Sequence, residues 1–123
     1  MAKTYALVVG VVLLLVGIVG FFVGDSTLFG LGFTTPHNLI HLLSGAIGIW
    51  AGTSKNVGAA RMFALIFGAI YTLVAIAGFA TGGEDLFGIS LKLNTTYNII
   101  HLLIGVLGLG AGFTGTKASA TAQ

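Results

Sequence analysis

Two apolar runs of this chain carry polar side chains that could do chemistry. The run HNLIHLLSGAIGIWAG contains Asn38 and His41, and the run YNIIHLLIGVLGLGAG, sixty positions later, contains Asn98 and His101. Imidazole binds haem iron and transition metals. A polar side chain within an apolar run is costly unless it finds a partner, so such residues are candidates for a functional site.

Axial ligation of a cofactor is the most specific chemistry that this pattern could support. His41 and His101 occupy equivalent places in the two runs, and a glycine follows each of them one turn later, at Gly45 and Gly105. Helical bundles hold cofactors between facing side chains, and glycine leaves room for a macrocycle. One interpretation is therefore a haem b held between the two histidines, or a chlorin on each.

A metal site is a second interpretation. His37 and His41 have the i, i+4 spacing that places two imidazoles on one face of a helix. The three acidic residues of the chain, Asp25, Glu84 and Asp85, fall on the same side of the predicted membrane and could complete a site of His and carboxylate ligands.

A purely structural role is the third interpretation. Asn38 lies one turn from His41, so the two side chains could hydrogen-bond each other, and Asn98 could do the same with His101. Hydrogen bonds of this type between membrane helices contribute about 0.6 kcal/mol on average, which is enough to fix how two helices meet without any chemistry.

Hydrolytic catalysis is not indicated. Ser44 follows His41 by three residues, but the matching position in the second run is Ile104. Nothing resembles a nucleophile elbow or an oxyanion loop. We therefore expect no enzyme activity and no catalytic residue.

The composition is that of a membrane protein. Hydrophobic residues make up 56% of the 123 residues and charged residues only 7%, whereas a soluble domain carries about 25% charged residues. The five basic residues are scattered singly, which argues against a nucleic-acid partner. Without cysteine there can be no disulfide, thiolate metal site or iron–sulfur cluster.

Four runs are long enough to cross a bilayer as helices, because about 17 residues are the lower limit. We expect Thr35 to cap the second run. The four runs are Tyr5–Val23, Pro36–Gly52, Met62–Ala80 and Tyr97–Phe113. The sequence thus predicts an all-α membrane protein in which four transmembrane helices form a compact bundle.

The basic residues predict the orientation of these helices. Four of the five fall in the N-terminus, the second connection or the C-terminus, at Lys3, Lys55, Arg61 and Lys117; Lys92 falls on the other side. Under the positive-inside rule, both termini are expected in the cytoplasm.

The two halves of the chain resemble each other. A shift of 58 positions aligns the first run with the third, and a shift of 60 aligns the second with the fourth. We therefore predict one domain, residues 1–114, built from two helical hairpins in parallel duplication at about 5–53 and 62–113. Residues 115–123 are expected to form a flexible tail.

Glycines recur along single faces of the predicted helices. Small residues permit close approach of helices where lipid removes any hydrophobic drive for association. The stripes of the second and fourth runs continue from the Asn and His residues through Gly45, Gly48 and Gly52, and through Gly105, Gly108 and Gly112. The first and third runs offer Gly10, Gly17, Gly20 and Gly24, and Gly68, Ala75, Gly78 and Gly82.

The repeated element Asn-x-x-His followed by Gly-x-x-Gly resembles a bacterial family of small four-span membrane proteins classed only as a domain of unknown function. The element occurs here as HNLIH at 37–41 and NIIH at 98–101, each with its two glycines. The resemblance covers nearly the whole chain. It implies a four-helix protein of a bacterial or cyanobacterial membrane and brings no activity with it.

These observations favour a small accessory or scaffold subunit that acts through helix contacts within a larger membrane assembly. Its partners would be the bilayer and other membrane subunits, or further copies of itself. The alternative is a haem or chlorin carrier that uses His41 and His101 in electron transfer or light harvesting. A conduit for a small solute is the third interpretation.

Overall fold

The protein is described by a computed structural model that gives the backbone of residues 1–122 and the side chains of these residues except at 57 and 115–122. It is all-helical apart from two short β-hairpins in its connections, in agreement with the predicted class. The helices are α1 (Ala2–Val23), α2 (Thr35–Thr53), α3 (Val57–Thr81) and α4 (Thr95–Ala122). The strands are β1 (Thr27–Leu28), β2 (Leu31–Gly32), β3 (Asp85–Leu86) and β4 (Ile89–Ser90).

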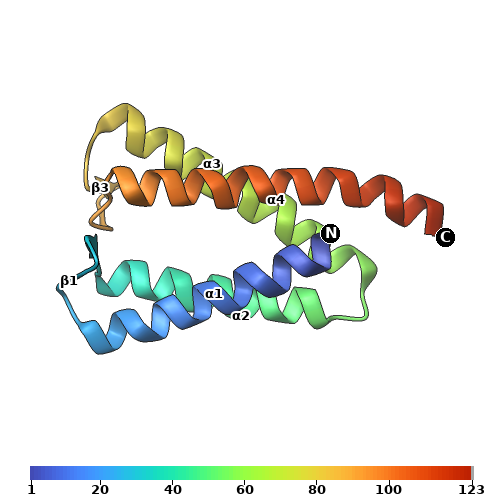
Figure 1. The fold of residues 1–123 in the computed structure, drawn as a ribbon, viewed down its shortest axis with the longest axis horizontal. Helices are drawn as coiled ribbons and strands as arrows, with labels where there is room; N and C mark the ends of the chain where they lie inside the picture. The colour runs from blue at the N-terminus through green and yellow to red at the C-terminus, as the bar shows by residue number, and fades with distance from the viewer. Residues whose placement is uncertain (123) are drawn as a thin grey trace.

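The helices form two hairpins (Figure 1). α1 packs along α2 and α3 packs along α4, whereas contacts between the two hairpins are sparser. The β1–β2 and β3–β4 connections lie at one end of the molecule, and both termini lie toward the other end together with the connection from α2 to α3. The predicted tail at 115–123 lies outside the residues whose side chains the structure describes.

Three of the helices, α1, α3 and α4, are long and apolar enough to cross a membrane. α2 does not meet this requirement on its own composition. Its first three turns carry the polar residues of the repeated element together with Pro36 and Ser44, which lower its hydropathy. Three of the four predicted spans therefore have the length and hydropathy that a membrane-crossing helix needs.

Glycines bring the backbones of each helical hairpin into contact. A Cβ atom added at Gly10 would lie 2.7 Å from the backbone nitrogen of Ile49, and one added at Gly68 would lie 2.7 Å from the backbone nitrogen of Leu109. These distances are far inside van der Waals contact. Only glycine therefore permits the observed separation of α1 from α2 and of α3 from α4.

Two glycines assigned to these stripes have a different role. Gly24 and Gly82 are the C-caps of α1 and α3, with φ angles of 73° and 62°, and a Cβ atom at either position would meet no atom within 4 Å. The sequence assignment was wrong for both, because each helix ends at the glycine. The positive φ angle there, rather than a close approach, explains the residue type.

The start of α2 also differs from expectation by one residue. The Thr34 hydroxyl, not that of Thr35, accepts a hydrogen bond from the backbone N–H of His37. In α4 the Asn94 side chain accepts one from the N–H of Tyr97. Both are standard N-caps.

An aromatic cluster joins the two helical hairpins toward the end that carries the termini. The rings of Phe63 and Phe67 stack with centroids 4.4 Å apart. The hydroxyl of Tyr5 in α1 donates a 2.7 Å hydrogen bond to the carbonyl of Ile104 in α4. This contact links the first helix directly to the last.

The close approach of the paired helices makes a prediction about stability. Gly10→Ala and Gly68→Ala place a methyl group against the backbone of the neighbouring helix, so each should lower the free energy of unfolding in detergent by about 1–3 kcal/mol. Denaturant titration followed by circular dichroism measures the effect.

Gly110→Ala is the matched control, because a Cβ atom at Gly110 in α4 meets no atom within 4 Å. This variant should be neutral or slightly stabilising, since alanine has the higher helix propensity. Equal effects at Gly68 and Gly110 would contradict the glycine-contact account.

Candidate functional site

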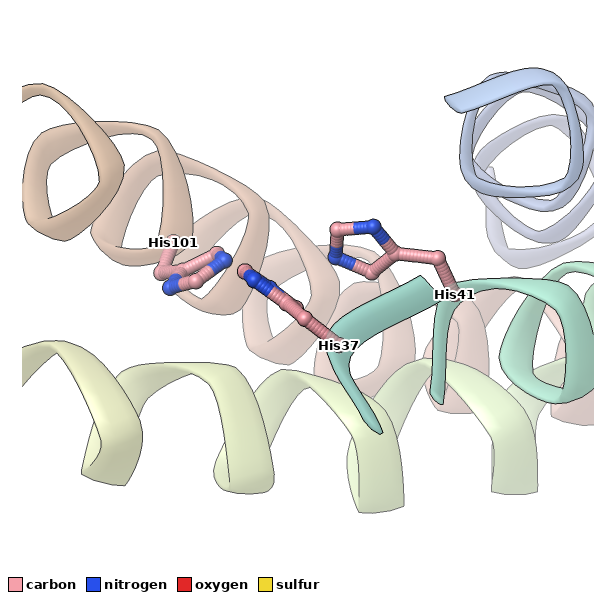
Figure 2. Close-up of side chains that lie close together, drawn as sticks. All are labelled: His37, His41 and His101. Carbon is pink, nitrogen blue, oxygen red and sulfur yellow. The ribbon is translucent and has the colours of Figure 1, made fainter. Parts of the chain in front are cut away.

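The three histidines of the chain converge between the two helical hairpins (Figure 2). His37 and His41 come from α2 and His101 comes from α4, and each is at least 96% buried. One ring nitrogen from each lies within 4.8 Å of the others. The centroid of the His37 ring is 4.2 Å from that of His41 and 5.7 Å from that of His101, whereas His41 and His101 are 6.5 Å apart.

The tautomer of His37 follows from its hydrogen bond. Its Nδ1 lies 3.0 Å from the carbonyl oxygen of Leu91, in the segment after β4. A carbonyl can only accept, so Nδ1 carries the proton and Nε2 keeps its lone pair. A histidine whose other nitrogen donates to a backbone carbonyl is the usual arrangement for a metal ligand.

Buried polar atoms without partners gather at the same place. Nδ1 of His101 makes no hydrogen bond to any described residue. The Tyr71 hydroxyl approaches Ser44 but makes no hydrogen bond of good geometry with it or with another described residue. Such atoms cost about 1–3 kcal/mol each when nothing satisfies them. These atoms are available to bind an ion or a polar ligand.

A cavity of about 210 Å³ adjoins the histidines. This volume is large enough for an ion with several waters but below the roughly 300–1,000 Å³ of sites that take drug-sized ligands. Its walls are mostly apolar. The residues around it are the three histidines, Ile40, Ser44, Phe67, Ile70, Tyr71, Val74 and Leu91.

Hydrogen bonds between the two helical hairpins close the site at the end that carries the β-hairpins. The hydroxyl of Thr34 donates to the carbonyl of Ser90 at 2.6 Å, and the side chain of Asn94 donates to the carbonyl of Gly30 at 2.9 Å. The Tyr97 hydroxyl donates to the carbonyl of Gly32 at 2.7 Å. These bonds hold the connecting segments over the histidines.

The acidic residues do not complete the site. Asp25, Glu84 and Asp85 are exposed, and Asp25 forms a 3.2 Å ion pair with Lys92 instead. The prediction that carboxylates complete the metal site was therefore wrong. The connections hold the acids in solvent, and His101 supplies the third donor.

The asparagines do not accompany the histidines into the cluster. The side chain of Asn38 packs against Gly20 and that of Asn98 against Gly78, each within its own helical hairpin. Each asparagine precedes its histidine by three residues, which turns the two side chains about 60° apart around the helix. The asparagine faces the paired helix, and the histidine faces the other hairpin.

Sequence reasoning missed Tyr71 as part of the site. The signal for it was present, since Gly68, Tyr71, Ala75 and Gly78 follow the same 3, 4, 3 spacing as the glycine stripes.

Comparison with known proteins bears on the family of the chain. No curated protein and no solved structure matches it. A family model does match residues 3–114, which is nearly the whole chain. The chain therefore belongs to the family described as "Domain of unknown function (DUF4383)", in agreement with the uncharacterised family expected from its sequence.

Proposed function

We propose that this membrane protein binds a divalent transition-metal ion through His37, His41 and His101. The observation that carries the proposal is the meeting of three buried imidazoles whose nitrogens lie within 4.8 Å of one another. Imidazole suits zinc, copper, nickel and iron. Three protein ligands leave one coordination position open, as in catalytic rather than structural zinc sites.

The energetics of burial support a bound ion. Imidazoles held away from water need partners for their nitrogens, and His101 Nδ1 has none among the described residues. An ion coordinated by all three rings would supply those partners at once. Since all three ligands are neutral, the ion keeps its charge and would favour an oxygen ligand at the fourth position.

The same geometry gives less support to a haem or chlorin between His41 and His101. The ring of His37 is nearer to each of them than they are to each other, so it occupies the space that a macrocycle would need. The cavity is also too small for one. An ion fits the arrangement without rebuilding it.

We further propose that all four helices cross the bilayer as two duplicated hairpins. α2 contacts α1 from Gly10 to Gly20, so it shares the same slab of membrane. Contacts at matching positions in the two halves support a duplication, with Gly10 on Ile49 and Gly68 on Leu109 as one pair. The positive-inside rule then favours cytoplasmic termini, in a bacterial membrane.

A role as an accessory subunit is a second candidate and is compatible with a metal site. It is favoured by large apolar side chains on the outer face, including Val8, Leu43 and Leu107, each more than half exposed. Acyl chains of the bilayer would cover the same face. A solute conduit has less support, because glycine contacts close the interior of each helical hairpin.

Metal binding is tested with purified protein in detergent. Bound Co²⁺ should give the visible d–d absorption bands of a low-coordinate site. Zn²⁺ should displace the Co²⁺ and abolish these bands. His37→Ala, His41→Ala and His101→Ala should each weaken Co²⁺ binding by at least about 10–100-fold. Loss of a residue that only hydrogen-bonds to a metal ligand already costs this much, and these variants remove a ligand itself.

Asn98→Ala is the matched control, because Asn98 lies one turn from His101 in α4 but packs against Gly78 and is not among the three ligands. It should retain the Co²⁺ spectrum. Absence of bands in the unmodified protein would contradict the proposal.

Topology is tested by single cysteines, since the chain contains none. Phe29→Cys, in the exposed β1–β2 connection, should react with a membrane-impermeant thiol reagent in intact cells. Lys55→Cys, between α2 and α3, should react only after permeabilisation. Equal labelling of both in intact cells would show that α2 does not cross.

A further inference from the structure

We propose that the cavity beside the histidines opens sideways to the bilayer, between α2 and α3, and takes the head group of a lipid-soluble phenol or quinol. The inference rests on the proposed metal site, because the oxygen of this head group would meet the ion at its open position. It adds the route of entry and the chemical class of the ligand.

The walls of the cavity indicate the route. At the end that carries the β-hairpins, Leu91 and the bonds between the connections lie over it. Toward the termini, Phe67 lines it and stacks on Phe63. Two lining residues, however, reach the outer surface, since Ile40 of α2 is 40% exposed and Ile70 of α3 is 47% exposed. In a membrane, this surface faces acyl chains rather than water.

The size of the cavity suits one aromatic ring. An apolar cavity of about 150 Å³ binds benzene, so about 210 Å³ accommodates a six-membered ring with its oxygen. The apolar walls, including Phe67, Ile70 and Val74, would contact the ring. A chain attached to the ring could leave between Ile40 and Ile70.

Polar groups are placed where the oxygen of such a ligand would lie. Ser44 and Tyr71 line the cavity together with the histidines. The Tyr71 side chain is 95% buried, and its hydroxyl has no well-formed hydrogen bond to a described residue. A phenolic oxygen could accept from it while coordinating the ion. A fully apolar lipid would leave this hydroxyl unsatisfied.

The two halves differ at this opening. The equivalent gap lies between α4 and α1, and its matching residues are less polar: Ser44 corresponds to Ile104 and Tyr71 to Leu13. The Tyr5 hydroxyl is already bonded to the carbonyl of Ile104 on that side. If both gaps served packing alone, nothing would confine the hydroxyls of Ser44 and Tyr71 to one of them.

The experiment uses the full chain, loaded with Co²⁺ in lipid nanodiscs, and the probe 4-octylphenol. The d–d bands should shift saturably as the probe binds. Phenol, which lacks the octyl group, should need at least a tenfold higher concentration to give the same shift, because it does not accumulate in the bilayer. Equal potency of the two probes would overturn entry from the membrane.

Two variants localise the binding. Ser44→Ile introduces the residue of the other half and fills the cavity, so it should keep the Co²⁺ bands and weaken the probe-induced shift at least tenfold. Ile104→Ser is the matched control and should leave the shift unchanged. Tyr71→Phe removes one hydroxyl with little change of volume and should weaken the probe about 2- to 10-fold.

The outcomes separate the two proposals. If Co²⁺ gives no bands, the metal site fails and this inference fails with it. If the bands form but 4-octylphenol leaves them unchanged, or if Ser44→Ile and Tyr71→Phe both respond as the unmodified protein does, the metal site stands and the proposed ligand site is overturned.

Discussion

Direct backbone contact at glycine is the constraint on which this structure depends. In lipid, apolar side chains gain nothing by leaving their surroundings for one another, so helices associate where they fit most closely. Gly10 and Gly68 bring each pair of helices to the limit of steric contact. Each helical hairpin is therefore a tightly packed unit. The looser fit between hairpins leaves room for a cavity, and the three histidines lie there.

The candidate site belongs to neither helical hairpin alone. His37 and His41 come from the first and His101 from the second, while Tyr71 reaches the cavity from α3. Similar halves supply a common frame, with equivalent histidines at positions 41 and 101. The departures from similarity at His37, Ser44 and Tyr71 give one side of the interface its polar character. In this protein, functional specialisation is read from where the halves differ.

Sequence patterns predicted the helices and the polar candidates because both depend on local periodicity and hydropathy. They could not predict that His37, His41 and His101 meet, since this depends on how one helical hairpin is rotated against the other. The same reason explains why Asn38 was grouped with His41 although it packs within its own hairpin. Gly24 was misassigned because a stripe and a C-cap use the same residue at the same spacing.

The hydrogen bond from His37 to the carbonyl of Leu91 joins an imidazole of the cluster to the backbone just after β4. That backbone belongs to the β3–β4 connection, whose tip carries the exposed Phe87. Any displacement of this connection that broke the bond would leave the buried Nδ1–H of His37 without its acceptor. The position of the β3–β4 connection and the orientation of one imidazole in the cluster are therefore linked, alongside the other hydrogen bonds that join the connections.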